Sequence, residues 1–184
     1  LSAGPTPILE TKSQPQHKSA KTHKSGLNSI NGAGLESQND FIVTGKAMVS
    51  DVPITYLGYV NRDSGVIEET GHPLDGRAIE DTILIYPKGS GSTVAPFVLM
   101  GLVYTGKGPK AIINRDVCPL TLPACSLLDV PYGHGFDQDP CLEINDGDLI
   151  EMNRKDGVVT VKILERNSDL SLIHISEPTR RYSI

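Results

Sequence analysis

The sequence contains no tryptophan and only three phenylalanines. No apolar run approaches the roughly 20 residues that cross a bilayer, and no charged-then-apolar secretion signal opens the chain. Lys and Arg number 17 against 22 Asp and Glu, which gives a net charge of -5, and they form no basic face. Because phosphate binding needs clustered positive charge, these features exclude a nucleic-acid surface. We therefore expect neither nucleic acid nor a membrane as a partner.

Cysteine is also scarce. The three cysteines are Cys118, Cys125 and Cys141, with six and fifteen residues between them, and this spacing matches no zinc pattern. If two of them formed a disulfide, the third would remain unpaired. Cysteine commonly behaves as a small apolar residue, so we expect these three to be reduced and buried, with no metal site. Reduced thiols suit a cytoplasmic location.

The chain divides into three segments of different composition. Residues 1–40 are rich in Ser, Gly, Pro, Gln and Lys, which predicts a disordered tail or interdomain linker. Residues 41–166 have the dense apolar pattern of one folded domain. Residues 167–184 are expected to be a second tail, within which 170–184 resembles a translated sequencing adapter and is excluded from functional argument.

Within the central segment, apolar patterns alternate with turn residues and predict an α/β fold. The expected strands are residues 41–49, 54–57, 82–86 and 110–114, followed by a hairpin of 148–152 and 157–164 whose turn contains Asp156-Gly157. One expected helix follows the glycine loop at 87–93, and a second spans about 120–128. Antiparallel strands at both ends and a strand-helix-strand unit between them indicate mixed sheets with one main helix.

The glycine loop between strand 82–86 and this helix is the most informative feature. Pro96 belongs in the first helical turn, so the helix should begin between Ser92 and Pro96. Glycines allow close approach of the backbone, and a helix start leaves N–H groups unpartnered, so a carboxylate or phosphate is favoured there. On chemistry alone, the simpler interpretation of Ser92 is an ordinary helix cap. An apolar stripe of Val94, Phe97, Val98, Gly101 and Leu102 is expected to pack on the sheet.

Five short motifs occur in one order and register, and together they resemble the swivel domain, or small subunit, of the aconitase X family over about residues 41–164. The motifs are Gly45-Lys46-Ala47, His72-Pro73-Leu74-Asp75-Gly76, Gly91-Ser92-Thr93, Ala111-Ile112-Ile113-Asn114 and Asn145-Asp146-Gly147-Asp148. The resemblance implies a swivelling β/β/α fold that closes over a larger catalytic domain, fused or separate, which contains an iron-sulfur cluster. No cofactor is then expected in this chain itself.

The resemblance also implies a role for the loop. In aconitases the corresponding loop reads Gly-Ser-Ser-Arg, and its first serine, which falls on Ser92, is the catalytic base. Val94 replaces the arginine here. A serine alkoxide would need N–H donors and a helix start to stabilise it, which this loop could supply. Gly91, Thr93 and Lys88 are the accompanying candidates for substrate binding.

His72 is a further substrate-binding candidate, because Pro73 extends its backbone and its ring could face an interdomain cleft. The alternative is a turn histidine satisfied by the backbone.

Two classes of function follow. The chain is expected to be a hydro-lyase component, inactive alone, acting on a small hydroxy acid. Cis-3-hydroxy-L-proline is the preferred substrate because the chain looks like part of a fused protein, and phosphomevalonate is the alternative. A non-catalytic module that binds a small anion or a partner remains the other class.

Overall fold

A computed structural model describes residues 29–168. Residues 1–28 and 169–184, which include the adapter-like segment, lie outside the described part. The strands are β1 Ser29–Gly34, β2 Phe41–Val49, β3 Ile83–Tyr86, β4 Ala111–Asn114, β5 Tyr132–His134, β6 Leu149–Lys155 and β7 Val158–Glu165. The helices are α1 Tyr56–Tyr59, α2 Ala95–Tyr104, α3 Leu122–Leu127 and α4 Pro140–Glu143.

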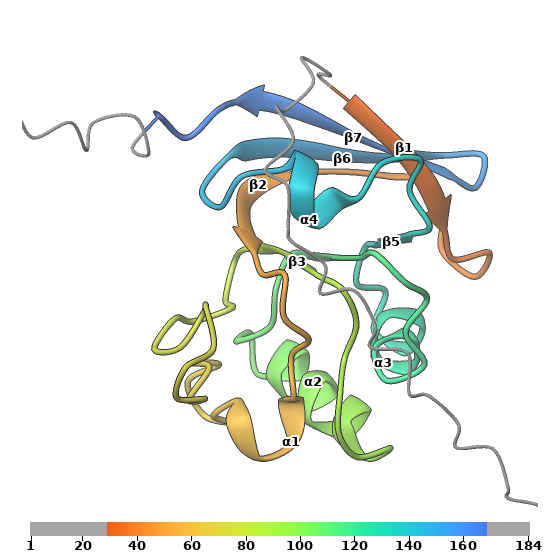
Figure 1. The fold of residues 1–184 in the computed structure, drawn as a ribbon. Helices are drawn as coiled ribbons and strands as arrows, with labels where there is room; N and C mark the ends of the chain where they lie inside the picture. The colour runs from red at the N-terminus through yellow and green to blue at the C-terminus, as the bar shows by residue number, and fades with distance from the viewer. Residues whose placement is uncertain (1–28, 169–184) are drawn as a thin grey trace, which may run out of the picture.

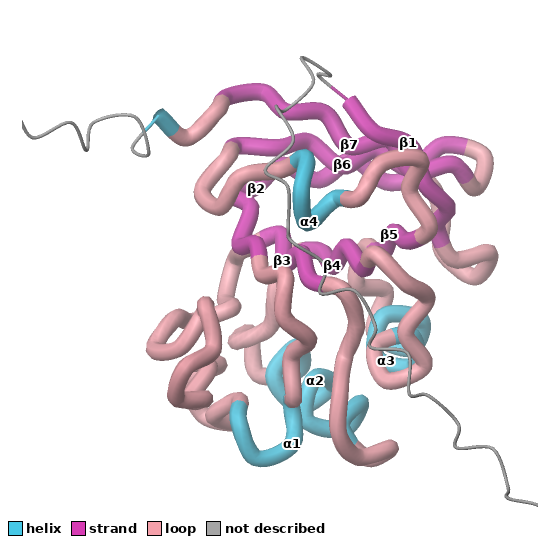
Figure 2. The backbone as a smooth tube through the Cα atoms, in the orientation of Figure 1, coloured by secondary structure: helices cyan, strands magenta, loops and turns pink. Residues whose placement is uncertain are grey.

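The strands of the described region form a closed barrel in the order β1-β5-β4-β3-β2-β6-β7, and β7 pairs with β1 to close it. The pairs β2/β3, β3/β4 and β4/β5 are parallel, and the remaining pairs are antiparallel. Figures 1 and 2 show α1, α2 and α3 gathered on one side of β3 and β4, with the long antiparallel strands on the other. The mixed α/β class is confirmed, although the strands form one closed sheet instead of separate sheets.

Both faces of the central strands are buried because successive residues of a strand point to opposite sides. Ile83 and Ile85 of β3 belong to a cluster with residues of β6 and β7, whereas Leu84 and Tyr86 belong to a second cluster with α2 and α3. All four side chains have no exposed surface. β3 therefore contributes to both halves of the core. Its carboxyl end, where the next loop begins, is held in place by this packing.

Most predicted elements are confirmed. Strands at 41–49, 82–86 and 110–114 correspond to β2, β3 and β4, and α2 begins at Ala95, inside the predicted interval. The predicted hairpin is also present. Its strands continue to Lys155 and resume at Val158, so the turn is shorter than expected. Positive φ angles at Asp156 and Gly157, 50° and 84°, are those of a two-residue hairpin turn.

The folded region begins earlier than predicted. Residues 29–34 form β1, which pairs with β7 from Ser29↔Lys162 to Ala33↔Val158. The expectation of a disordered tail that reaches residue 40 is therefore wrong for its last part. At the other end, the Asn167 N–H donates to Asp148 Oδ1 at 2.7 Å, so the domain includes this residue as well.

Residues 54–57 do not form a strand. Only Ile54 makes an isolated parallel bridge, to Gly89, and α1 begins at Tyr56. The bridge brings this segment alongside the glycine loop.

The expected apolar stripe of α2 is wrong in part. Val98 and Leu102 are buried as predicted, but Val94 is 46% exposed and Phe97 is 69% exposed. Ala95 and Leu99 take their place against the core. Periodicity failed here because α2 is apolar on every side, so no polar residue marks the outer face.

Candidate functional site

The glycine loop, residues 87–93, lies at the carboxyl ends of the parallel strands β3 and β4. The Asn114 side-chain N–H donates to the Tyr86 carbonyl at 3.1 Å, and the Asp116 N–H donates to the Pro87 carbonyl at 3.1 Å. These bonds hold the segment after β4 against the beginning of the loop. In α/β barrels and open α/β sheets alike, ligands commonly bind at the carboxyl edge of parallel strands, and two loops meet at that edge here.

The first half of the loop is anchored on both sides. The Gly89 N–H donates to Cys118 Sγ at 3.0 Å, and the Ser90 N–H donates to the Ile54 carbonyl at 2.9 Å. The hydroxyls of Ser90 and Thr55 also share a hydrogen bond. Segments far apart in the sequence therefore fix residues 89 and 90. No local sequence pattern predicts Thr55 or Cys118 as contacts of the loop.

The second half of the loop is open. Ser92 and Thr93 are exposed, and the Val94 N–H approaches Ser92 Oγ at 3.4 Å, a long hydrogen bond. Ser92 is not the N-cap of α2; that position is Val94, which makes no side-chain capping bond. Within residues 29–168, the N–H groups of Gly91, Ser92 and Thr93 have no hydrogen-bond acceptor.

Three adjacent unpartnered N–H groups beside a helix start favour a negative charge. Gly91 makes this arrangement possible, because residues other than glycine rarely adopt its backbone φ angle of +89°. The Ser92 oxygen is at the surface, where it can reach a ligand. The loop can therefore bind an anion and present a hydroxyl beside it.

A groove with a volume of about 390 Å³ adjoins the loop. It is lined by residues 88–91 of the loop and 117–120 of the segment after β4. Lys88 is exposed at this groove and makes no ion pair with any described residue. The structure thus brings Gly91 and Lys88 together at the groove, with Ser92 and Thr93 next to them in the chain.

The structure does not bring His72 to this groove. His72 is 7% exposed, and its Nδ1 accepts a hydrogen bond from the Leu74 N–H at 3.1 Å. Its Nε2 is buried and has no partner among the described residues. The ring therefore satisfies the backbone of its own turn, which agrees with the alternative given above.

A buried hydroxyl network lies beneath the loop. Tyr86 OH bonds to Tyr56 OH at 2.9 Å and to Thr121 Oγ1 at 3.0 Å. Burial raises the pKa of Tyr56 and of Tyr86, so both remain neutral hydrogen-bonding groups. Tyr86 is the last residue of β3, and the network therefore fixes the point at which the loop begins.

The cysteines are free and buried, as predicted. Burial raises the pKa of the Cys141 thiol to about 12. Among residues 29–168, no three His, Cys, Asp or Glu side chains are grouped so that they could hold a metal ion. No helix in this part of the chain has the length and apolar composition needed to cross a membrane.

The fold and the loop together define a class of protein: an α/β domain that presents a serine and free N–H groups at the carboxyl edge of parallel strands. The model of the family described as "Aconitase X swivel domain" matches residues 36–161. The chain belongs to this family.

Relatives and a solved structure agree with this assignment. The chain is 31% identical over 115 residues to the phosphomevalonate dehydratase small subunit of Methanosarcina acetivorans, covering 62% of this chain and 80% of that one. It is 34% identical over 116 residues to the protein of the same name from Methanocella arvoryzae, covering 63% and 88%. The crystal structure of Thermococcus kodakaraensis aconitase X in its holo-form superposes with a TM-score of 0.66 at 27% identity, covering 74% of this chain and 98% of that chain.

Proposed function

We propose that this chain is the small subunit, or swivel domain, of an aconitase X-type dehydratase, and that it supplies Ser92 as the catalytic base. The observation that carries the proposal is the exposed Ser92 hydroxyl beside three unpartnered N–H groups, in a chain of this family. A large catalytic subunit would complete the site. Alone, the chain would have no dehydratase activity.

Ser92 would remove a proton from the carbon next to a carboxylate. To accept that proton, Ser92 must first lose its own, so that Oγ carries a negative charge. This charged form is unfavourable in water, because a serine hydroxyl is a very weak acid. The N–H groups of residues 91–93 and the start of α2 favour the negative charge at this position. The electron pair left on carbon forms the double bond as the C–O bond on the neighbouring carbon breaks. The departing hydroxide takes up one proton from solvent and leaves as water, and Ser92 then releases the proton that it accepted.

The substrate is proposed to be a phosphorylated hydroxy acid, namely phosphomevalonate. The relatives reported above bear the name phosphomevalonate dehydratase small subunit, and they lend no support to cis-3-hydroxy-L-proline, the substrate preferred from the sequence. Phosphomevalonate carries a carboxylate and a phosphate. Lys88 and the free N–H groups beside the groove suit such an anion, and Lys88 would supply the charge that Val94 lacks.

The iron-sulfur cluster that the resemblance implies does not fit this chain's own thiols. Cys118, Cys125 and Cys141 are buried and ungrouped, and Cys118 Sγ already accepts the Gly89 N–H. An iron-sulfur cluster needs several thiolates converging on one point. We therefore place the cluster in the large subunit and assign it no contact with this chain.

The test is reconstitution of the full chain with the large subunit from the same organism. Phosphomevalonate and cis-3-hydroxy-L-proline are supplied separately, and the dehydrated product is measured. Ser92→Ala should lower kcat about 100- to 10,000-fold, the range for loss of a general base. Ser64→Ala is a matched control, because Ser64 Oγ also accepts the N–H two residues ahead, at 3.3 Å, but in a different loop.

Full activity in the Ser92→Ala enzyme would exclude Ser92 as the base. Turnover of cis-3-hydroxy-L-proline but not of phosphomevalonate would exclude the proposed substrate.

The non-catalytic alternative rests on Val94, which stands where aconitases have arginine. A module that binds anions by itself should bind phosphomevalonate or inorganic phosphate without a second subunit. Calorimetric titration of the chain alone separates the two functions: micromolar binding favours the module, and its absence favours a site completed by another subunit.

A further inference from the structure

Helix α2 has an unusual surface for its position. Its ten residues, Ala95–Tyr104, include no charged side chain, and the Tyr104 hydroxyl is its one polar side-chain group. Surface helices normally have a polar outer face, and a helix that is apolar all round is normally buried on every side. α2 is buried on one side only, so apolar side chains on its outer face are exposed to water.

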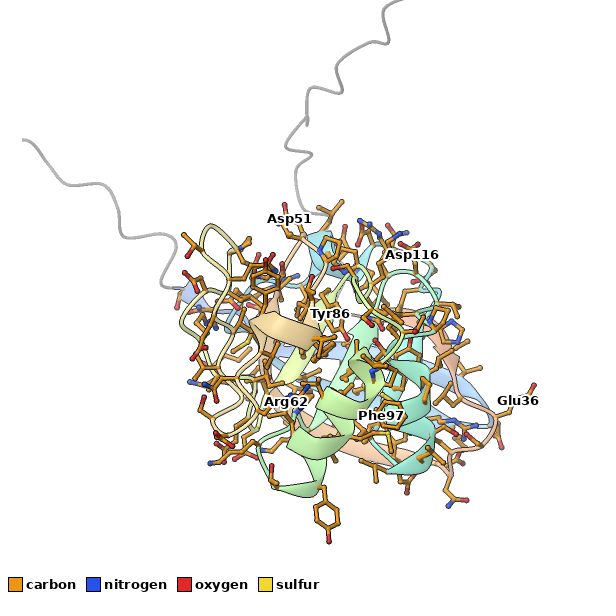
Figure 3. All side chains as sticks on the ribbon, turned by 90° about the horizontal axis from the view of Figure 1, so that it is seen from below. Glu36, Asp51, Arg62, Tyr86, Phe97 and Asp116 are labelled. Carbon is orange, nitrogen blue, oxygen red and sulfur yellow. The ribbon has the colours of Figure 1, made fainter. Side chains whose placement is uncertain are left out.

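The exposed residues lie on one line along the helix. They are Val94, Phe97, Gly101 and Tyr104, whose spacings of three and four place them within a single stripe. We call these residues the α2 stripe. The buried residues of α2 lie on the opposite side, against the core. Figure 3, which views the molecule from the side of α2, labels Phe97 there.

The two aromatic side chains of the stripe are highly exposed, Phe97 by 69% and Tyr104 by 87%. At such exposures two aromatic rings present on the order of 300 Å² to water. This area is comparable to the largest apolar patch on a typical monomer, and such patches are often functional. Aromatic residues are also the ones enriched at the centres of protein interfaces.

The stripe begins at the candidate site. Val94 is two residues after Ser92, and from Val94 the stripe extends about 15 Å along the helix to Tyr104, at 1.5 Å per residue. Val94 also contacts Ser92 directly, because its N–H lies 3.4 Å from Ser92 Oγ. Because α2 carries no charge, an apolar surface is the partner that suits it best.

We propose that the α2 stripe is the docking surface for the large subunit of the dehydratase, with Phe97 at its centre. The occupant follows from the proposed function, on which this inference rests: the subunit that closes the Ser92 site must lie against the first turn of α2. A standard interface buries about 800 Å² on each partner, so the stripe would form its apolar centre and the glycine loop would adjoin it.

The test measures binding of the full chain to the purified large subunit by biolayer interferometry. Phe97→Glu should weaken binding at least 30-fold, as expected for an aromatic residue at the centre of an interface. Ile42→Glu is the matched control, because Ile42 is exposed to nearly the same extent, 68%, and lies on β2 away from α2. Both variants should unfold at nearly the wild-type temperature, since both side chains are mainly in water.

Equal binding by Phe97→Glu and the wild-type chain would overturn the proposal, as would no binding by the wild-type chain. A third contrary result would be a wild-type homodimer in sedimentation equilibrium that Phe97→Glu abolishes, because a second copy would then occupy the stripe. Ser92→Ala keeps the two hypotheses separate. This variant should bind the large subunit normally whether or not Ser92 is the base, and only its turnover tests the proposed function.

Discussion

Replacement of Gly91 by alanine tests whether the glycine loop is held against Thr55. Gly91 has a φ of +89°, and a Cβ atom at this position would lie 2.9 Å from Thr55 Cγ2. Two costs follow, one from the backbone conformation and one from the steric overlap. Gly71 separates them, because its φ is +87° and a Cβ there would have no atom within 4 Å.

Alanine in the left-handed region costs about 1–2 kcal/mol relative to glycine. Gly71→Ala should therefore lower the free energy of unfolding by about that amount. Gly91→Ala adds the overlap with Thr55 Cγ2, and overpacking of this kind costs typically 1–3 kcal/mol. We expect Gly91→Ala to be the more destabilising by at least about 1 kcal/mol, which lowers Tm by about 4 °C beyond the control.

Thr55→Ser supplies the decisive comparison. Serine lacks Cγ2 but keeps the hydroxyl that bonds to Ser90 Oγ. Combined with Gly91→Ala, it should recover about 1 kcal/mol of the loss, and a double-mutant cycle by urea unfolding measures this coupling. If Gly91→Ala and Gly71→Ala cost the same, and Thr55→Ser changes neither, the loop is not packed as described.

Two further predictions concern the core beneath the site. Tyr86→Phe removes the hydroxyl that bonds to Tyr56 and Thr121. It should lower the free energy of unfolding by about 1–3 kcal/mol in a urea titration, because the two buried partner hydroxyls each lose a hydrogen bond. Tyr104→Phe, at an exposed position, should have no effect in the same titration. The second prediction concerns pH. Burial raises the pKa values of Tyr56, Tyr86 and Cys141, the last from 9 to about 12, so the unfolded chain releases protons first as the pH rises. Stability should begin to fall at about pH 9, with a slope that approaches about 1.4 kcal/mol per pH unit for each such group. Constant stability from pH 8 to 11 would contradict this.

The strands and the loop between β3 and α2 could be predicted because their signals are local. An apolar run followed by Gly-Ser-Gly-Ser and a proline in the first turn has few other solutions. β1 could not be predicted in this way. Its sequence, Ser-Ile-Asn-Gly-Ala-Gly, has one large apolar residue, Ile30, and it becomes a strand because β7 and β5 pair with it.

The candidate site divides in the same manner. The unpartnered donors at residues 91–93 follow from a glycine loop before a helix, so the sequence could suggest them. The anchors at Thr55 and Cys118 are 35 and 28 residues from Ser90. No local pattern relates them to the loop, since they meet it only after the barrel has closed. For His72 the local sequence was compatible with two roles, a substrate ligand or a hydrogen-bond acceptor within its own turn. The structure shows the second, since the Leu74 N–H donates to His72 Nδ1.

The distribution of contacts along the loop has a consequence for how a second subunit could act on Ser92. Residues 89 and 90 are bonded to Cys118, Ile54 and Thr55, whereas residues 91–93 donate no backbone bond within the described chain. The loop is therefore restrained on the side of β3 and less restrained on the side of α2. A subunit that docks on α2 would reach Ser92 from the less restrained side. It could then adjust the hydroxyl and its N–H groups without breaking any hydrogen bond that holds the loop to the barrel.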